Sequence, residues 1–362
     1  MGRGHHAEAV EAARALISSH PGHGDAWNGL GVSLGQLGRH GEACAALDRA
    51  LEIDPANAAS WANRGLMRHL LGRFEEALSD HDQALRLRPD FAHALKNRAS
   101  TLRLLRRPDE ALASCDAAIR IDPGMAEAHN NRGNVLLEQR RLPEALLSYD
   151  EALRLAPSHP EALANRGTLL RELGRHEEAA VSLREALRHR PSFEFLHGQY
   201  LHTRTRTCDW DGLEAEIGAL PDKVRAGQRV IPAFSLLALV DDPALHRRAA
   251  EIQVESSCAS APRLGPLTPP EPGRCIRVGY YSADFHNHAT CILIAEMLES
   301  HDRERFETYG FSFGPRADDA MRRRVSRAFT RFIDVAGHSD VEIARVESLG
   351  WWLPGSQTTC SA

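Results

Sequence analysis

The chain has 362 residues, of which 43% are apolar and 26% charged, with a formal net charge of −5. This length is too great for one compact core, and the mild acidity argues against a nucleic-acid-binding protein. No apolar run is long enough for a membrane span or a secretory signal, and seven scattered cysteines favour reduced thiols in a cytoplasm, with no metal site or cofactor expected.

A 34-residue repeat fills residues 24–193 in five copies. Apolar residues in each copy follow the i, i+3, i+4, i+7 pattern of amphipathic helices, and a proline closes each copy. A small residue recurs where two helices are expected to cross, at Gly31, Gly65, Ala99, Gly133 and Gly167. Since one copy cannot bury its own apolar face, the copies must stack as antiparallel helix pairs. Residues 7–23 match only the second half of a copy, which predicts one helix before the array.

Two further positions of the repeat have structural meaning. Left-handed helix ends are expected at Gly38, Gly72 and Gly174, with Arg106 and Arg140 at that place in the other two copies. A large residue recurs at Trp27, Trp61, Leu95 and Leu163, with His129 as the exception. The W-x-x-x-G start, the A-x(6)-A segment and the closing proline resemble the tetratricopeptide repeat. This resemblance implies a right-handed superhelix with a concave, peptide-binding surface.

Asparagine stands two residues after the large residue in four copies, whereas Gly29 takes this place in the first. We name these four residues, Asn63, Asn97, Asn131 and Asn165, the asparagine ladder. Asparagine is a poor residue for a helix interior, so the ladder requires an explanation. Two interpretations are open. Each amide ties a repeat to a backbone carbonyl of its neighbour, or the amides bind peptide bonds of a partner, at about 0.5–1.5 kcal/mol per hydrogen bond.

The pattern changes twice after the repeats. Residues 194–257 lose the 34-residue phase but stay helical, and residues 258–275 are proline-rich, which predicts a helical connector and then an extended linker. Strands and helices then alternate, which predicts a parallel α/β sheet. The strands are expected at 276–282, 306–313 and 331–335, and the helices at 291–300, 318–329 and 339–349. Ligands of such sheets bind after the strands, here at the loop A-D-F-H-N-H-A-T, residues 283–290.

The segment R-V-G-Y-Y-S-A-D-F-H-N-H-A-T is similar to the opening of the catalytic region of O-linked N-acetylglucosamine transferases, in their bacterial form. The C-D-W segment at 208–210 resembles the helices before that region. The resemblance implies an inverting enzyme with two Rossmann-like lobes, which transfers N-acetylglucosamine from its UDP donor to Ser or Thr hydroxyls of proteins. It also implies that the asparagine ladder grips the acceptor backbone.

The same resemblance gives His288 the place of an active-site histidine, once proposed as a general base. A neutral imidazole could take a hydroxyl proton if it lies within hydrogen-bond reach. The alternative is a loop histidine that only orders the strand end. His286 has no counterpart in the family and is expected to be exposed.

The resemblance breaks off after Gly350, where a fourth strand is expected but residues 351–362 show no strand pattern. We expect this tail to be a frameshifted or prematurely terminated end, and residues 276–350 to be a partial N-terminal lobe. The second lobe, which holds most of the donor site in the family, is not found, so we expect no donor binding or transfer by this chain alone. An unpaired edge near 331–335 would make residues 277–362 the least stable part.

The expected fold is mainly α, a tetratricopeptide superhelix followed by a helical connector and an incomplete Rossmann-like α/β unit. Two functions stay open: the protein-binding arm of an O-GlcNAc transferase-like protein, or a non-enzymatic scaffold for proteins. Both place protein or peptide partners in the concave groove, and neither predicts nucleic acid or membrane as a partner. A third, an adaptor that clamps C-terminal carboxylates, would need Lys and Arg where the ladder has asparagine.

Overall fold

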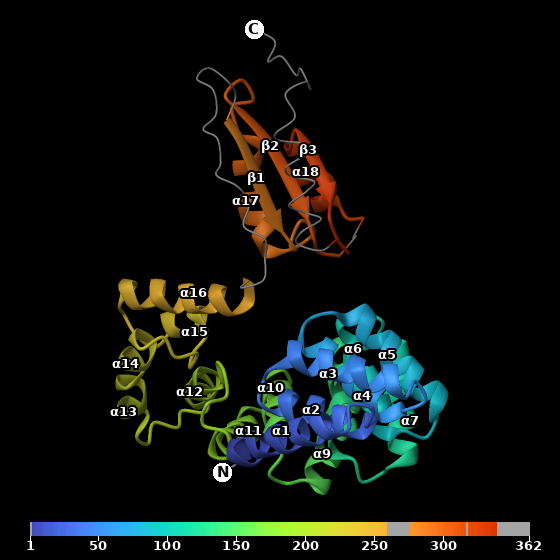
Figure 1. Cartoon of the computed structure of the whole chain (residues 1–362). Helices are drawn as coiled ribbons and strands as arrows, with labels where there is room; N and C mark the ends of the chain where they lie inside the picture. The colour runs from blue at the N-terminus through green and yellow to red at the C-terminus, as the bar shows by residue number, and fades with distance from the viewer. Residues whose placement is uncertain (1, 259–275, 316–317, 339–362) are drawn as a thin grey trace. The chain divides into compact units, whose positions relative to one another are not determined.

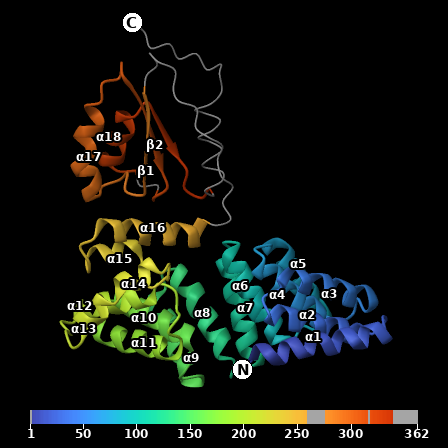
Figure 2. The same ribbon diagram turned by 60° about the vertical axis from the view of Figure 1, so that its left-hand side comes forward.

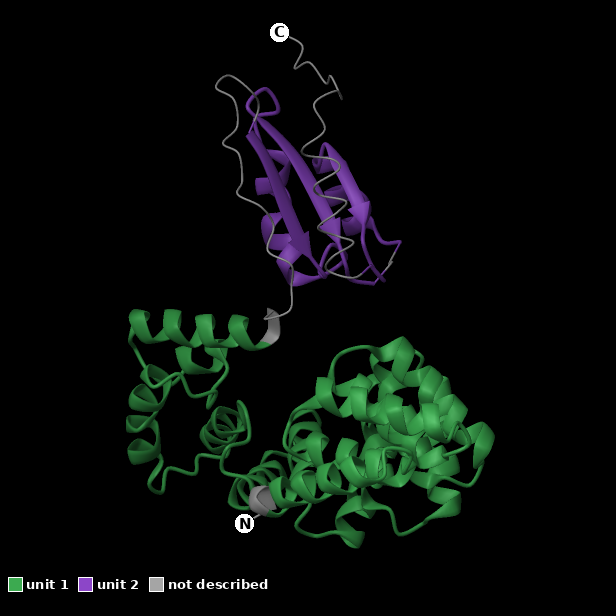
Figure 3. Cartoon of the chain, in the orientation of Figure 1, with its two compact units in different colours: residues 1–257 green, residues 258–362 purple. Residues whose placement is uncertain are grey.

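A computed structural model describes residues 2–258, 276–315 and 318–338, and the chain divides into two compact units (Figure 3). In its described part, the first unit, residues 1–257, is helical, and the second, residues 258–362, holds a small sheet and two helices. The expected fold class is therefore confirmed. No helix among the described residues is long and apolar enough to cross a membrane. The linker, the helix predicted at 339–349 and the tail lie outside the described residues.

Ten helices of the first unit form five antiparallel pairs, in which a 13-residue helix precedes a 14-residue helix. The pairs follow one another along a superhelix (Figures 1 and 2). They are α2 (Gly24–Gln36) with α3 (His40–Ile53), α4 (Ala58–Leu70) with α5 (Phe74–Leu87), α6 (Ala92–Leu104) with α7 (Pro108–Ile121), α8 (Ala126–Glu138) with α9 (Leu142–Leu155), and α10 (Pro160–Glu172) with α11 (His176–His189). Helix α1 (Gly2–Ser19) packs on α2 through Val10 and Leu30.

The two helices of a pair cross at the recurring small residue. A Cβ atom on Gly31 would lie 2.6 Å from the Cγ atom of Leu47 and 3.2 Å from the carbonyl oxygen of Ala43, so only a small residue fits. The residue that faces the crossing stands 16 positions later in every pair: Leu47, His81, Cys115, Tyr149 and Leu183. The pair with the larger crossing residue, Ala99, has the small side chain of Cys115 opposite it. In this pair the smaller facing side chain offsets the larger crossing residue, as close packing requires.

The turn inside each pair contains a left-handed residue, as expected. The φ angles are 78°, 76° and 74° at Gly38, Gly72 and Gly174, and 58° and 61° at Arg106 and Arg140. The two arginines adopt a conformation that costs a residue with a Cβ about 1–2 kcal/mol. The turn geometry is therefore imposed by the packing of the pair, and not only by glycine.

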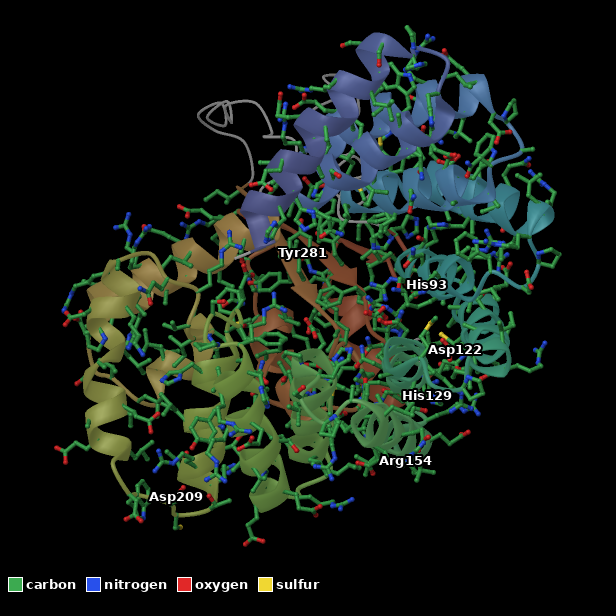
Figure 4. All side chains as sticks on the ribbon, turned by 60° about the horizontal axis from the view of Figure 1, so that its bottom comes forward. His93, Asp122, His129, Arg154, Asp209 and Tyr281 are labelled. Atoms are coloured by element: carbon green, nitrogen blue, oxygen red, sulfur yellow. The ribbon has the colours of Figure 1, made fainter. Side chains whose placement is uncertain are left out.

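The large residue of the repeat anchors the preceding proline. The indole nitrogens of Trp27 and Trp61 donate to the carbonyl oxygens of Pro21 and Pro55, at 3.0 and 2.9 Å. His129, the exception in the sequence pattern, lies on α8 (Figure 4) and has its Nε2 atom 3.2 Å from the carbonyl oxygen of Pro123. The imidazole therefore preserves the hydrogen bond that the indoles make.

The structure carries the repeat phase one helix beyond the fifth copy, where the sequence pattern is lost. Helix α12 (Leu196–Arg206) ends one repeat period after α10, and Cys208, one period after the left-handed Gly174, has a φ of 55°. The C-D-W segment is therefore the turn of a sixth, degenerate pair. Asp209 in this turn (Figure 4) accepts a hydrogen bond from Arg204, whose side chain is only 4% exposed.

The sixth pair departs from the others because its small residues have become leucines. Leu201, Leu213 and Leu220 each stand one repeat period after a glycine or an alanine of the fifth pair, and all three are buried. A second helix cannot approach α12 as closely, and it is broken into α13 (Leu213–Gly218) and α14 (Leu220–Arg225). Helices α15 (Ala233–Leu237) and α16 (Pro243–Cys258) complete the connector and close its apolar core around Leu201.

The second unit holds a parallel sheet of three strands, β1 (Ile276–Ser282), β2 (Phe306–Ser312) and β3 (Arg331–Asp334), in the order β1-β2-β3. Helices α17 (Ala289–Glu299) and α18 (Ala320–Ala328) connect the strands and lie on one face of the sheet (Figures 1 and 2). Right-handed crossovers between successive strands in this order require both helices on that face. Phe285, Cys291 and Phe329 form the core between helices and sheet.

His81 is a buried histidine at a crossing where other pairs have an apolar residue or a tyrosine. Neither ring nitrogen has a hydrogen-bond partner, and burial lowers the pKa of His81 to about 3. The ring is therefore neutral in the folded chain, whereas an exposed histidine titrates near 6.5. The unfolded chain binds the extra proton as pH falls below about 6.5, so His81 lowers the stability of the fold progressively between that pH and about 3.

We predict that His81→Leu stabilises the first unit, because leucine stands at this place in the first and fifth pairs. The gain should be about 1–3 kcal/mol at pH 7, from removal of two unpartnered nitrogens, and larger at pH 5. Urea unfolding midpoints at the two pH values measure both effects. His93→Leu, at an exposed histidine on α6 (Figure 4), is the control, and an equal change in that variant would contradict the assignment.

Candidate functional site

The first helices of the five pairs form one face of the superhelix. Helices α2, α4, α6, α8 and α10 contact one another in sequence, whereas successive second helices contact each other less. Elements on the inside of a curved stack lie closer together than those on the outside. We therefore name the solvent side of these five helices the inner face. The asparagine ladder lies on four of them, and all four side chains are half-buried.

Two members of the ladder hydrogen-bond to the pair before them. The Nδ2 atom of Asn63 donates to Oδ1 of Asn28, at 3.0 Å. The Nδ2 atom of Asn131 donates to the hydroxyl of Ser100, at 2.9 Å, and makes a longer 3.5 Å contact with a backbone carbonyl oxygen. These amides tie α4 to α2 and α8 to α6, and their partners are mainly side chains.

The other two members differ from each other. The Nδ2 atom of Asn165 donates to Oδ1 of both Asn130 and Asn134, at 2.9 Å, which uses both of its N–H groups. The Asn97 amide makes no hydrogen bond to the described residues, and no described donor reaches Oδ1 of any ladder member. Three of the four members thus donate to a neighbouring repeat, and all four amide oxygens are left as acceptors.

A further amide continues the ladder on α12. Gln199 stands one repeat period after Asn165, and its Oε1 atom accepts from the hydroxyl of Thr168, at 3.3 Å, and from Arg171, at 2.9 Å. Sequence reasoning missed this residue because the phase was taken to end at Pro191. The register alone would have identified it.

A second in-phase row was also missed, which we name the arginine row: Arg64, Arg98, Arg132 and Arg166. Each arginine on a first helix bonds to an aspartate on the second helix of the preceding pair and to a serine or aspartate of its own pair. Arg132 donates to Asp116 at 2.7 Å and to the hydroxyl of Ser148 at 2.8 Å. The aspartates of the preceding pairs share the repeat period: Asp48, Asp82, Asp116 and Asp150.

The arginine row is confined to the middle of the array. At the junction of α1 and α2, Leu30 replaces the arginine and Arg14 replaces the aspartate. At the junction of α11 and α12, Tyr200 stands in the place of the arginine and Arg184 in the place of the aspartate. Four junctions therefore carry an ionic contact, and the two at the ends do not.

In the second unit, the loop after β1 brings His288 beside Asp284. The Nδ1 atom of His288 accepts a hydrogen bond from the backbone N–H of Thr290, at 3.2 Å, and caps the N-terminus of α17. The Asp284 carboxylate lies 3.6 Å from this nitrogen and accepts from the Thr290 hydroxyl at 3.3 Å. The capping bond leaves the Nε2 atom of a neutral ring as the protonated, donating nitrogen.

The other residues of this loop have structural partners. Phe285 is buried against Phe329, and Arg322 of α18 donates to the Phe285 carbonyl oxygen, at 3.2 Å, and to the Ser312 hydroxyl, at 3.0 Å. His286 was expected to be exposed, but it is half-buried. Among the described residues, no group of His, Cys, Asp or Glu side chains is arranged to hold a metal ion.

Comparison with protein families separates the two units. A model described as "Tetratricopeptide repeat" matches residues 1–58, 70–126 and 127–192, and a second model of that description matches residues 46–79. The model "Glycosyl transferase family 41" matches residues 266–345.

A curated protein of Arabidopsis thaliana, the probable UDP-N-acetylglucosamine–peptide N-acetylglucosaminyltransferase SEC, is 27% identical to this chain over 161 residues. The match covers 40% of this chain and 16% of that protein, so the chain matches only a small part of its relative's length. Among solved structures, the APC/C hetero-tetramer Cut9-Hcn1 is similar with a TM-score of 0.55 and 14% identity, over 69% of this chain and 46% of that chain. Pseudomonas aeruginosa pilF has a TM-score of 0.50 and 21% identity, over 55% and 90%. At these identities the likeness shows the fold alone.

We predict that Arg132→Ala destabilises the first unit by about 1 kcal/mol, because it removes a partly buried contact that joins three helices. Arg141→Ala is the matched control, since its partner Glu144 lies only three residues further along the chain and the two side chains are 43% and 46% exposed. Urea midpoints should fall for the first variant only. In 1 M NaCl the difference should shrink, and equal midpoints of both variants in low salt would contradict a role in joining repeats.

Proposed function

This chain belongs to the tetratricopeptide-repeat family, and we propose that its inner face binds an extended polypeptide along the asparagine ladder. The observation that carries this proposal is the row of amide oxygens, one in each of four successive repeats, with no donor from the described chain. The backbone N–H groups of a bound polypeptide supply such donors whatever its sequence. The half-buried position of the amides strengthens each bond relative to water.

The polypeptide in this proposal is an acceptor protein of an O-GlcNAc transferase-like reaction. The match of residues 266–345 to glycosyl transferase family 41 and the likeness to the Arabidopsis enzyme support this part. The donor in that reaction is UDP-N-acetylglucosamine. Four ladder bonds of modest strength suit an arm that holds many different acceptors, because none of them reads a side chain.

Within this proposal, His288 acts as a hydrogen-bond donor, and not as the base expected from the resemblance. Its Nδ1 atom is engaged by the Thr290 N–H, so Nε2 is the nitrogen available to a substrate. A base role would require the cap of α17 to open first. Asp284, 3.6 Å from Nδ1, would favour that alternative by holding a proton on Nδ1.

We predict that Asn97→Ala weakens polypeptide binding by about 2–10-fold and leaves stability unchanged, because the Asn97 amide makes no bond within the described chain. Asn165→Ala should weaken binding and also lower the unfolding midpoint, since it breaks two bonds to α8. The probes are labelled peptides enriched from a random peptide library on the full chain, followed by fluorescence anisotropy. Asn287→Ala, in a loop of the second unit, is the control.

The proposal would be refuted by a folded variant with alanine at all four ladder positions that binds the enriched peptides as tightly as the native chain. Circular dichroism and the urea midpoint establish whether that variant is folded. Competition by unlabelled peptide excludes binding elsewhere on the surface.

A second candidate is a repeat scaffold without transferase activity, favoured by the repeat models that cover most of residues 1–192. Calorimetry of the full chain with UDP-N-acetylglucosamine distinguishes the two. Heat of binding that disappears with excess UDP supports the transferase arm. Peptide binding without any heat from the donor supports the scaffold.

A further inference from the structure

At the junction between α10 and α12, an arginine stands where the α6–α8 junction has a glutamate. In the third and fourth pairs, Arg103 near the end of α6 donates to the carboxylate of Glu138 at the end of α8, at 2.6 Å. The residues two repeat periods later are Arg171 and Arg206. The positions that hold an arginine and a glutamate between α6 and α8 therefore hold two arginines between α10 and α12.

No carboxylate compensates this pair. Arg171 is half-buried and donates to the neutral amide of Gln199, at 2.9 Å, and neither arginine has an acidic partner in the described chain. The pKa of the Arg171 guanidinium is lowered by burial and then by the charge of Arg206. Arg206 is exposed, whereas Arg171 is half-buried, so the charge of Arg206 acts on a guanidinium that is partly shielded from water. Like charges in this arrangement disfavour each other, and a bound anion would relieve the cost.

Further basic groups lie around the same point. His202, one turn before Arg206 on α12, has its pKa lowered by burial and then by the charges of Arg171, Arg206 and His176. A surface cavity of about 400 Å³ lies beside Arg206 and is lined by residues 174–178 and 206–208, so Arg171 and His202 lie outside its lining. Of the two glutamates that line it, Glu178 is paired with Arg175, and Glu177 is exposed and makes no ion pair with a described residue.

The carbonyl ends of α10 and α12 do not explain the cluster. A helix C-terminus favours a cation by a modest amount, and this holds equally for Arg103 at the end of α6. Arg103 nevertheless has a carboxylate partner. Among the five junctions between successive first helices, only α10–α12 has an arginine at both positions of this register.

We propose that Arg171, Arg206 and His202 form a subsite for an oxyanion, a phosphate or carboxylate group, at the end of the inner face beside Gln199. Arginine guanidinium groups suit such a ligand, since their fork of N–H donors matches its oxygens. We further propose that the oxyanion is carried by the polypeptide on the asparagine ladder, and this second part rests on the proposed function. The subsite would then favour acidic or phosphorylated segments at one end of an otherwise sequence-tolerant face.

The first test uses inorganic phosphate and the full chain. Phosphate should raise the melting temperature of the native chain by about 2–4 °C more than that of Arg206→Glu, at equal ionic strength. The variant should also melt higher than the native chain without phosphate, because it restores the pairing seen at Arg103. General stabilisation by phosphate acts on both proteins, so an equal rise in both would overturn the subsite.

Two more variants ensure that the conclusion does not rest on Arg206→Glu alone. Arg206→Gln removes the like charge without adding a carboxylate, and it should also lose the extra phosphate effect. Glu138→Arg builds a second arginine pair, with Arg103, and should gain a phosphate effect that the native chain lacks at that junction. A Glu138→Arg chain with unchanged phosphate response would contradict the pairing argument.

The second test concerns the polypeptide. A library-selected peptide that contains Asp or Glu should bind Arg206→Glu about 10-fold more weakly than the native chain, whereas its Asn and Gln counterpart should bind both equally. If phosphate stabilisation depends on Arg206 but acidic peptides do not, the subsite takes free anions and the second part is refuted. Failure of the proposed function is read separately, from the alanine variants of the asparagine ladder.

Discussion

The first unit depends on one constraint, the close crossing of the two helices in each pair. A glycine or alanine at the crossing lets the facing side chain reach the opposite helix, and that side chain ranges from Cys115 to Tyr149. A glycine stands opposite leucine, histidine or tyrosine, so what the crossing requires is one very small residue on the first helix. Where the crossing residue becomes Leu201, the second helix breaks and the connector begins. The boundary between repeats and connector is therefore a packing limit.

The repeat phase, the three strands and the parallel sheet could be predicted because each follows from a local period or from recurring small residues. The sixth pair escaped prediction, since the proline that closes each copy has no counterpart after α14, where Arg225 stands. The arginine row escaped because its partners stand 16 positions before and after, and only stacking brings them together. The cap formed by His288 depends on backbone geometry that a motif does not contain.

The asparagine ladder joins repeats through the amide nitrogens of Asn63, Asn131 and Asn165, and its amide oxygens remain as acceptors on the inner face. A side chain held by its donor end keeps its acceptor end in place. Under the proposed function, this would lower the entropy lost when a polypeptide binds. The Asn97 amide makes no hydrogen bond to a neighbouring repeat, so its substitution can test peptide binding without breaking a contact between repeats.

Each helix pair touches mainly its neighbours, so small changes of tilt at every junction add up along the unit. The four junctions that carry the arginine row resist such changes, while the junctions at Leu30 and Tyr200 lack this ionic contact. The first unit should therefore be stiffer at its middle junctions than at its two ends. Salt screens the ionic junctions, so the stiffness of the middle should fall as ionic strength rises.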